Sequence, residues 1–516
     1  MAAGVCTRRR AALRPPLAAG SRDGPLLRAR LSRGALRRCA RASGAERDPA
    51  PAPLALVVGG GPCGNAAAAL LASRGFRVDL REREREHEPR AAPGGARRRG
   101  YSVVLTPRGV KAALAAGVDV HTLPAAVPLR GFANARGVRE APGHVAVPRG
   151  ALADALAQAA EEAGATRTSD QTLFGVNLNL ERQEAVFQSS EGHSEEVVKY
   201  DLLVGADGIH SSVRGAMEAQ LDDFAATQRS DFMLYKPLPV PAPGAEERQG
   251  CFNTWVASDA SELNCSILAP PNADGTLAGV LLLPEEGDVT FGSLGDDVEA
   301  NRAFLAKNFS EAFNGDQAAL LAAAECLAAQ RPSVGGLSTR TTSLVDPTNG
   351  VALCGDSGGS MWASLGQGCN CALESAVALA ESVGDVATTA GGAGAARKIK
   401  EGLLAYERAH HPNVEAAVEL SEGGMGSSKR RTMSRSFMAL IVTTLFLSKA
   451  FGFLGARPPA IMQISEAGVS FASIRSLWRV QQGVATAILA CTATALVLAA
   501  VAAVRTLAAA VFGVRL

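Results

Sequence analysis

Residues 54–82 constrain the fold of this chain more than any other stretch. Residues 54–58 are a short run of apolar side chains, typical of a strand buried on both faces of a parallel sheet. Three glycines follow at the spacing GxGxxG, and they are Gly59, Gly61 and Gly64. An alanine-rich stretch and a second apolar run come next, and that run ends at Glu82. Strand, glycine turn, helix and strand in this order predict a Rossmann-like dinucleotide-binding unit.

Each position of this unit has a physical reason. The first glycine permits a tight turn, the second lets the backbone approach a pyrophosphate, and the third lets the helix pack closely on the strand. Glu82 lies 23 residues after Gly59, where a carboxylate can accept hydrogen bonds from an adenosine ribose. An ordinary glycine turn between a strand and a helix is the alternative interpretation.

Two later stretches repeat the pattern of a strand followed by a turn. Residues 201–214 contain an apolar run that ends in Gly-Ala-Asp-Gly, with Asp207 in the turn. Residues 350–379 contain another, which ends at Gly355 and Asp356. An aspartate at the carboxyl end of a strand lies where ligands bind in open α/β sheets. We therefore expect Asp356 to accept hydrogen bonds from the ribityl hydroxyls of a flavin.

A further glycine turn, Gly366-Gln367-Gly368, opens a long predicted helix. The N-terminus of a helix carries the equivalent of about half a positive charge and presents free backbone N–H groups. Aimed at the edge of a flavin ring, this charge would stabilise the anionic reduced ring. Each later motif alone is compatible with a simple capped turn, but the three in this order favour a flavin-binding domain.

With GxGxxG, GADG and GD in this order, the chain resembles the single-component FAD-dependent aromatic hydroxylases, the group A flavoprotein monooxygenases. Within them it is most similar to the kynurenine 3-monooxygenases and their plastid-type relatives. The shared stretches are SVVLTPRG (102–109), Arg149 before ALADAL, the LGQGCN turn (365–370) and VSFASIR (469–475). The resemblance implies an α/β fold: a Rossmann-like FAD-binding domain, an interleaved β-rich substrate domain and a C-terminal helical membrane segment.

The resemblance also implies a reaction and a cofactor set. Members carry FAD, are reduced by NADPH or NADH, and hydroxylate an aromatic ring with molecular oxygen through a C4a-hydroperoxyflavin. No catalytic side chain is required, because the flavin carries the chemistry. Glu82 is expected to hold the adenosine ribose, Arg149 the FAD phosphates or ribityl chain, and Asp207 and Asp356 the middle of the cofactor. The full set of expected FAD-binding positions is Gly59, Gly61, Cys63, Gly64, Glu82, Arg83, Arg149, Asp207, Gly355, Asp356, Gly366, Gln367, Gly368, Cys369 and Asn370.

The chain departs from the family pattern around the expected pocket. The usual GDAAHxxxPxxGQG motif here has Gly359 and Ala363 at its histidine and proline positions, which we expect to widen the loop that carries Trp362. The Pro-x-Arg-x-Arg stretch of the kynurenine enzymes keeps Arg130 but has Phe132 at its second arginine. Their later Asn-Tyr pair falls at 424–425. Trp362, Phe132 and Arg130 are the pocket candidates, and we expect a substrate less charged than kynurenine.

The composition divides the chain into regions. The expected regions are 1–50, a transit peptide; 54–225 and 331–425, the two parts of the FAD-binding domain; 226–330, a β-rich substrate domain; and 430–516, a helical membrane region. Residues 1–47 hold twelve arginines and two acidic residues, which is typical of an organelle transit peptide. A basic arm that binds nucleic acid is the alternative. We expect the chloroplast membrane, with the mitochondrial membrane as the alternative.

The overall charge and the cysteines exclude other classes of protein. Lysine and arginine number 52 against 50 acidic residues, so the balance does not favour a nucleic-acid partner. The ten cysteines form no CxxC pair, so we expect no metal site and read them as reduced thiols. The adjacent His410 and His411 are expected on a helix surface.

The last hundred residues indicate a membrane. Residues 484–504 carry no charge over 21 residues, which corresponds to a helix of about 30 Å, enough to cross a hydrocarbon core. Residues 436–454 are apolar apart from Lys449. Burial as a core helix is the alternative for both stretches, and an interfacial helix is a further one for 436–454.

Three functions are compatible with these features. The first is a membrane-anchored FAD monooxygenase that hydroxylates an aromatic or otherwise apolar small molecule. The second is an FAD-dependent reductase or dehydrogenase of an isoprenoid-like lipid. The third is a flavoprotein that keeps FAD for stability and has lost turnover.

Overall fold

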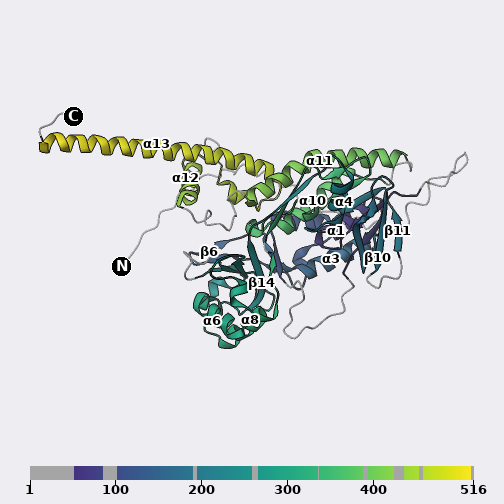
Figure 1. The fold of residues 1–516 in the computed structure, drawn as a ribbon, viewed down its shortest axis with the longest axis horizontal. Coiled ribbons are helices and arrows are strands. Elements are labelled where there is room, and N and C mark those ends of the chain that lie inside the picture. The colour runs from purple at the N-terminus through teal and green to yellow at the C-terminus, as the bar shows by residue number, and fades with distance from the viewer. Residues whose placement is uncertain are drawn as a thin grey trace, which may run out of the picture. The chain divides into compact units, whose positions relative to one another are not determined.

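The computed structural model describes residues 51–84, 101–189, 195–257, 265–334, 336–386, 393–422, 435–452 and 457–512. The predicted transit peptide and the Gly-Met pair at 424–425 lie outside these residues. The architecture is the expected α/β one, in which a parallel sheet with helices is joined to a second, mainly antiparallel sheet (Figure 1).

A six-stranded sheet forms the centre of the FAD-binding region. Its strands, in spatial order, are β20 (Val345–Asp346), β21 (Val351–Leu353), β12 (Leu202–Gly205), β1 (Leu54–Val58), β2 (Arg77–Arg81) and β8 (Thr166–Thr168). All neighbours pair in parallel except β20 with β21. Alternate residues of β1 belong to two different hydrophobic cores. Ala55 and Val57 pack in the core on one face of the sheet, and Leu56 and Val58 pack in the core on the other face. The apolar run is therefore buried on both faces, as predicted.

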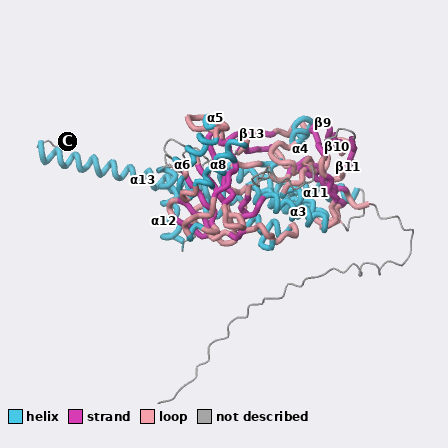
Figure 2. Tube along the Cα trace, turned by 90° about the horizontal axis from the view of Figure 1, so that it is seen from below, coloured by secondary structure: helices cyan, strands magenta, loops and turns pink. Residues whose placement is uncertain are grey.

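Helices cover one face of this sheet and a small sheet covers the other. The helices are α1 (Pro62–Ala72), α2 (Pro107–Ala115), α3 (Arg149–Glu162), α10 (Gly368–Val383) and α11 (Ala393–Glu422). On the other face lie β9 (Gln171–Asn179), β10 (Glu184–Ser189), β11 (Glu195–Lys199) and α4 (Ser212–Gln220). Strands β9 to β11 are antiparallel, as the alternating sequence between 165 and 204 predicts, and Figure 2 shows them beside α4.

A seven-stranded sheet forms the second region. Its order is β18 (Ser333–Val334), β14 (Met233–Val240), β17 (Leu277–Pro284), β16 (Ser266–Ala269), β15 (Cys251–Val256), β5 (Gly131–Asn134) and β6 (Gly137–Glu140). Four helices pack on one of its faces: α5 (Phe291–Leu294), α6 (Val298–Asn308), α7 (Ser310–Phe313) and α8 (Gln317–Ala329). Two of the strands, β5 and β6, come from residues 131–140. The first half of the chain therefore contributes to the sheet that the sequence placed entirely after residue 226.

Two small sheets join the regions. Strands β13 (Ala226–Ser230) and β19 (Leu337–Thr341) pair where the chain leaves and re-enters the FAD-binding region. Strand β7 (Val145–Pro148) pairs with β3 (Ser102–Leu105) and β4 (Val127–Pro128). Strand β7 runs directly into α3, so Arg149 is the first residue of that helix.

The C-terminal residues begin by packing on the FAD-binding region. Helix α12 (Arg435–Phe451) is followed by a short turn, η5 (Ala460–Gln463), and by α13 (Phe471–Phe512). The first part of α13 and η5 form a core with α11, and the buried members of that core are Ala416, Ala417, Leu420, Ala460, Ile464, Phe471, Ile474, Trp478 and Ala485. Residues 457–485 thus pack with the folded body of the protein, although they lie within the predicted membrane region 430–516.

Arg108 on α2 fixes this C-terminal segment. Its side chain is buried, its Nε donates to the carbonyl oxygen of Ile464 at 2.6 Å, and a second guanidinium nitrogen donates to the carbonyl of Val469. It also pairs with Glu374 of α10 at 3.2 Å, and its guanidinium carbon lies 4.4 Å from the centroid of the Phe471 ring. One cation therefore links two helices of the FAD-binding region to the start of α13.

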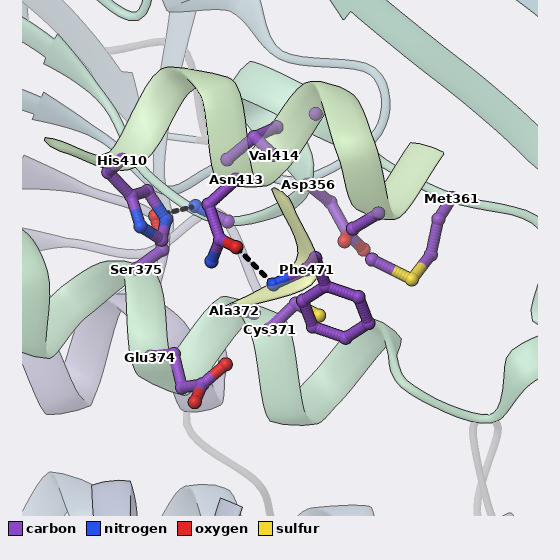
Figure 3. A pocket seen from close by; sticks show the side chains of 13 residues that line it. Asp356, Met361, Cys371, Ala372, Glu374, Ser375, His410, Asn413, Val414 and Phe471 are labelled. Atoms are coloured by element: carbon purple, nitrogen blue, oxygen red, sulfur yellow. Dashed lines mark hydrogen bonds between the residues drawn. The ribbon is translucent and has the colours of Figure 1, made fainter. Parts of the chain in front are cut away.

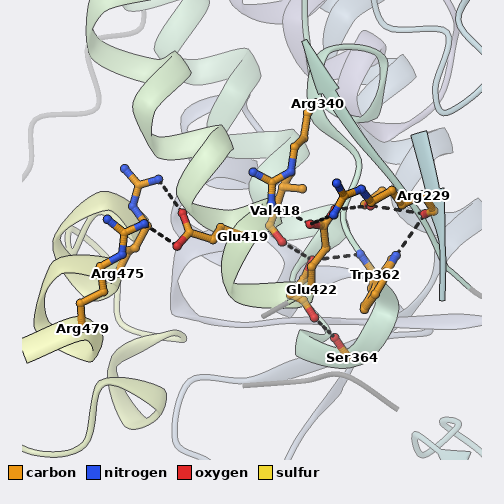
Figure 4. A network of polar contacts seen from close by, with 11 residues as sticks. Arg229, Arg340, Trp362, Ser364, Val418, Glu419, Glu422, Arg475 and Arg479 are labelled. Carbon is orange, nitrogen blue, oxygen red and sulfur yellow. Dashed lines mark hydrogen bonds and ion pairs between the residues drawn. The ribbon is translucent and has the colours of Figure 1, made fainter. Parts of the chain in front are cut away.

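Polar contacts from α11 complete the attachment of α13. The Asn413 Oδ1 accepts from the backbone N–H of Phe471 at 2.5 Å, which satisfies a free donor at the helix N-terminus. Glu419 accepts from Arg475 at 3.0 Å and from Arg479 at 2.5 Å (Figure 4). The helix is therefore held on α11 over its first turns.

Within the described part of the chain, α13 is the one helix long and apolar enough to cross a membrane, by length and composition. The other predicted membrane stretch, 436–454, coincides with α12, which has 17 residues. A helix of that length extends about 25 Å, less than a hydrocarbon core of about 30 Å. The expectation of a second spanning helix is therefore not supported.

We predict that Arg108→Met destabilises the protein by about 3 kcal/mol or more, because it removes a buried cation from the Glu374 carboxylate and two carbonyl oxygens. Thermal unfolding of the full chain in detergent measures this. The matched control is Lys111→Met, on the exposed side of the same helix, which we expect to change stability by less than about 0.5 kcal/mol. Equal effects of the two substitutions would contradict the role given to Arg108.

Candidate FAD-binding site

The GxGxxG turn is built as its spacing predicts. Gly59 has a φ of +104°, and a Cβ there would lie 2.5 Å from the carbonyl oxygen of Ala206. A Cβ on Gly64 would lie 1.8 Å from the carbonyl oxygen of Gly59. No side chain fits at either place, so α1 and β12 approach the turn as closely as backbone allows.

Glu82 at the end of β2 reaches over this turn. Its carboxylate accepts from the backbone N–H of Gly60 at 2.5 Å and from that of Glu84 at 2.7 Å. This places an acidic group beside the glycine turn, where a ribose bound there would present its hydroxyls. Arg83 is exposed, and its predicted role in cofactor binding stays a prediction.

Arg149 brings a positive charge to the same turn. One of its terminal nitrogens lies 3.5 Å from where a Cβ on Gly61 would stand. Its charge also acts on Asp356 and Cys369, whose pKa values it lowers against the effect of burial. A guanidinium between the glycine turn and the third motif can bind phosphate oxygens.

The third motif ends beside the first. Gly355 follows β21 with a φ of +67°, and a Cβ there would lie 2.8 Å from the Cys63 sulfur. The next residue, Asp356, begins the short helix α9 (Asp356–Gly359). Burial raises the pKa of the Asp356 carboxyl to about 6, and the nearby Arg149 opposes that rise. The aspartate thus lies at the carboxyl edge of the parallel sheet, as predicted.

The turn at Gly366-Gln367-Gly368 is fixed by Asn370. Its side-chain Oδ1 accepts from the backbone N–H of Thr106 at 2.9 Å, and its Nδ2 donates to the carbonyl oxygen of Val104 at 3.1 Å. A Cβ on Gly109 would lie 2.1 Å from the same Oδ1, so the TPRG stretch needs a glycine there. Asn370 therefore positions the first turn of α10 from within the protein.

The second motif serves α4 in this structure. The Asp207 carboxylate accepts from the Ser211 hydroxyl and from the backbone N–H of Ser212, both at 2.6 Å. Burial raises the pKa of Asp207, and these hydrogen bonds lower it. Its carboxylate thus caps the start of α4. Its predicted contact with the cofactor stays a prediction.

A pair of thiols lies where the first and third motifs meet, and no local sequence pattern predicts it. The sulfur atoms of Cys63 and Cys354 are 3.5 Å apart, although 291 residues separate them. Both are buried free thiols. Cys63 also donates to the carbonyl oxygen of Ala372 at 3.2 Å. The residue directly before the third glycine of GxGxxG therefore packs against the strand end that carries the third motif.

Tyr101 is a second residue that the sequence analysis missed. Burial raises its pKa, Arg149 lowers it, and Tyr235, Cys369 and Asp356 raise it further. These side chains therefore share one neighbourhood, which includes a residue of the seven-stranded sheet. The position of Tyr101 directly before SVVLTPRG could have marked it as a site residue. Its carbonyl oxygen accepts from the Arg149 backbone N–H at 3.3 Å.

A small cavity lies beside Asp356, between α10, α11 and the start of α13 (Figure 3). Val414 and His410 of α11 line it. His410 is 6 % exposed and stacks on Tyr406, with ring centroids 5.2 Å apart. Burial lowers its pKa to about 4. The expectation that His410 lies on a helix surface is wrong, because this face of α11 packs against α10.

The pocket candidates lie on different elements. Trp362 donates from its ring N–H to the carbonyl oxygen of Arg229 at 3.2 Å, and its backbone N–H donates to the Ser421 hydroxyl (Figure 4). Phe132 lies on β5, and its ring centroid is 5.7 Å from that of Phe252. Arg130 is exposed, and its guanidinium donates to the carbonyl oxygens of Glu246 and Gln249 at 3.3 and 3.4 Å.

Gly359 does not widen its loop, contrary to our expectation. It is buried, and a Cβ there would lie 2.0 Å from the Val414 Cγ1. Helix α11 therefore occupies the space that a larger side chain at this position would need. Ala363 is exposed, and nothing in the structure explains its replacement of proline.

Comparisons with known proteins agree with this site. A model of the family described as "FAD binding domain" matches residues 54–278. A kynurenine 3-monooxygenase of Salinispora arenicola is 30 % identical over 409 residues, which cover 76 % of this chain and 84 % of that protein. The enzyme of the same name from Stenotrophomonas maltophilia is 28 % identical, over 71 % of this chain and 77 % of that one.

Solved structures share the fold at lower identity. A mutant of 2-methyl-3-hydroxypyridine-5-carboxylic acid oxygenase aligns with a TM-score of 0.56 and 21 % identity, over 80 % of this chain and 96 % of that one. Klebsiella pneumoniae HpxO, complexed with FAD and uric acid, aligns with a TM-score of 0.54 and 18 % identity, over 85 % and 97 %. The fold and the three motifs thus define an FAD-binding flavoprotein.

The sequence identity and the share of both chains that is covered then identify the family within this class. The chain belongs to the kynurenine 3-monooxygenase family of FAD-dependent monooxygenases. Its own residues fit the cofactor. The Gln367 Oε1 is buried in the turn before α10 and has no hydrogen-bond partner among the described residues. Three glycines with no room for a Cβ, an arginine and an aspartate surround the same edge of the sheet.

We predict that the affinity for FAD falls as the pH drops through about 6. The pKa of Asp356 is raised to about 6, so the carboxylate that accepts hydrogen bonds from ribityl hydroxyls is present above that pH and lost below it. Linkage allows up to about a tenfold loss of affinity per pH unit below the pKa. Quenching of flavin fluorescence on titration of the FAD-free protein measures it.

Two variants test whether the Asp356 carboxyl causes this pH dependence. Asp356→Asn should bind FAD weakly above pH 6 and lose the step, whereas Glu374→Gln, another carboxyl beside the same cavity, should keep it. A wild-type affinity that stays constant from pH 7.5 to 5, or an unchanged step in Asp356→Asn, would contradict the assignment.

We also predict that Arg149→Ala weakens FAD binding by roughly 10- to 100-fold, the effect of about 1.5–3 kcal/mol from charge-assisted hydrogen bonds. Arg149→Lys should recover part of this, because it keeps the charge but not the fork of donors. The control is Arg77→Ala, an exposed arginine on β2. If the two alanine variants retain FAD equally well on dilution, Arg149 does not hold the phosphates.

Proposed function

We propose that the protein is an FAD- and NAD(P)H-dependent monooxygenase that hydroxylates a neutral aromatic or apolar small molecule with molecular oxygen. The observation that carries the substrate class is the composition of the open face of the seven-stranded sheet. Membership of the kynurenine 3-monooxygenase family supports the reaction type.

The two faces of this sheet differ in what covers them. Residues such as Leu238, Trp255 and Ile267 point to the helix-covered core. Their strand neighbours point the other way and are half-buried or exposed. These neighbours are Phe132, Tyr235, Pro237, Phe252, Thr254, Leu268, Val280 and Leu282. We call this set the open face.

One residue of the open face, Tyr235, lies near enough to Tyr101 to act on its pKa. That side chain and Asp356 both act on the pKa of Tyr101, which lies next to Arg149. The eight residues of the open face carry no charge. Among the described strand residues on this side of the sheet, a charged side chain enters at the edge strand β6, where the guanidinium of Arg139 lies 5.6 Å from the Phe132 ring centroid.

This composition favours neutral ligands. Moving a carboxylate against apolar side chains costs several kcal/mol unless a cation pairs with it. An apolar molecule on the same face gains about 25 cal/mol for each Å² removed from water. Phe132 is enclosed by Phe252 and by His144, whose ring lies 5.4 Å away. Burial lowers the pKa of that histidine, which keeps it neutral at pH 7.

The residues around the glycine turn and the third motif have defined tasks in this proposal. Bound FAD supplies the redox chemistry and oxygen activation. Gly59, Gly61 and Gly64 admit the pyrophosphate, Arg149 neutralises it, and Glu82 orients the ribose. The N-terminus of α10 offers backbone N–H groups and a partial positive charge. The open face holds the substrate and excludes water from it.

We also propose a location. The exposed apolar part of α13 supports anchoring to a membrane, and the arginine-rich residues 1–47 support import into an organelle, which we take to be the chloroplast rather than the mitochondrion.

The reductase alternative for an isoprenoid-like lipid shares the apolar face and the anchor. Incorporation of labelled oxygen from O₂ into the product separates the two, because only the monooxygenase transfers an oxygen atom. Bound FAD without any NAD(P)H oxidation would favour the flavoprotein that has lost turnover.

We predict that kynurenine neither perturbs the flavin spectrum nor accelerates NADPH oxidation, whereas neutral hydrophobic ligands shift the spectrum. Phe132→Arg should weaken those neutral ligands at least about tenfold, because it places a charge without a partner among apolar side chains. Difference absorbance titrations of the FAD-loaded protein measure both effects.

Arg139→Ala is the control for the one charge near this face, and it should leave neutral ligands unaffected. Kynurenine-stimulated NADPH oxidation with 3-hydroxykynurenine as the product would overturn the substrate class while leaving the FAD site unchanged.

A further inference from the structure

Exposed large hydrophobic side chains gather in the C-terminal segment. The described residues contain twenty of them, and twelve lie between residues 442 and 504. Eight of the twelve are on α13. The other four are Val442, Leu445 and Phe446 on α12 and Met462 in η5. An apolar surface of this kind marks contact with another molecule or a membrane.

The two sides of α12 differ. Ile441 packs against the core formed with α13, and Thr444 is 3 % exposed. Val442 and Phe446 are 59 % and 67 % exposed. Residues 441, 444 and 448 share one helical stripe, and 442, 445 and 446 share another. Val442, Leu445 and Phe446 make this second stripe apolar and exposed, Lys449 continues it toward the end of the helix, and no described part of the chain covers it.

The position of α12 along α13 limits what covers this stripe. Ala485 is the last buried residue of α13, and it belongs to the same core as Ile441. The exposed apolar stretch from Thr486 to Arg505 is about 30 Å long, which matches the hydrocarbon core. Helix α12 therefore meets α13 at the level where the membrane-spanning part begins.

The charges at this level are mostly positive. Lys449 and Arg457 are exposed, whereas Arg475 and Arg479 pair with Glu419 of α11. Glu466 is the one acidic residue among the described residues from 435 to 512. Basic side chains beside an apolar helix face are typical of segments that lie in the interface of an anionic bilayer.

We propose that α12 lies in the plane of the bilayer interface as a second, non-spanning membrane contact, with Val442, Leu445 and Phe446 among the lipid chains and Lys449 and Arg457 at anionic headgroups. This rests on the proposed membrane anchoring by α13. The contact places α11 and the start of α13, and with them the cavity beside Asp356, at the membrane surface.

Depth-dependent fluorescence quenching tests the proposal on the full-length, FAD-loaded protein. The protein is reconstituted into vesicles of about three parts phosphatidylcholine to one part phosphatidylglycerol. An environment-sensitive thiol probe is placed on the exposed Cys491 of α13, or on Phe446→Cys in a Cys491→Ser background. Lipids brominated near the headgroup or near the end of the acyl chain are the quenchers. Ala322→Cys, exposed on α8, is the matched control.

We expect the deep quencher to act most on Cys491 and the shallow quencher to act on Phe446→Cys at least about twofold more strongly than the deep one. Ala322→Cys should not be quenched. A Phe446→Cys probe that stays in water while Cys491 is quenched would overturn the proposal and leave the anchor intact. Equal, deep quenching at both sites would also overturn it, in favour of a second span. Absence of quenching at Cys491 would refute the anchor itself.

Discussion

The close approach of backbone at the carboxyl edge of the six-stranded sheet is the constraint on which the rest depends. Gly59 touches Ala206 at the end of β12, Gly64 touches the carbonyl of Gly59, and Gly355 touches Cys63. Glycine is required at each place because a Cβ would overlap a neighbour. Three motifs that are far apart in the chain thus meet at one edge, where open α/β sheets bind ligands. Arg149, Glu82 and Asp356 surround this edge, which gives it charges suited to a dinucleotide with a ribityl chain.

The sequence predicted the elements that depend on a local period or spacing. The strand at 54–58, the glycine turn, the helix at 151–164 and the strand-turn-helix at 350–379 each follow from neighbours within a few residues. The contacts that the sequence did not predict join segments that are distant in the chain. The pairing of β5 with β15, the contact between Cys63 and Cys354, and the reach of Arg108 to Ile464 join residues more than a hundred positions apart. Gly359 is the clearest case, because the helix that fills its space lies fifty residues later in the chain.

Arg108 connects the cofactor region to the C-terminal helix α13. Through it and through Asn413, the first turn of α13 is fixed to α2, α10 and α11, and the same helix continues into the exposed apolar stretch. The folded body is therefore attached to the long apolar helix α13 by a buried, hydrogen-bonded junction. If α13 spans a membrane as proposed, this junction holds the folded body in a fixed orientation to the bilayer.

The central claim is that FAD binds at the three-motif edge with its ring facing an uncharged sheet. A structure of the full-length protein loaded with FAD, determined by cryo-electron microscopy in a lipid nanodisc, tests it most directly. The account predicts that the pyrophosphate lies at Gly59–Gly64 beside Arg149, with the ring between the Gly366–Gly368 turn and the open face that includes Phe252, Leu268 and Val280. A ring positioned away from that turn, or a charged side chain of this chain paired across the open face, would contradict it.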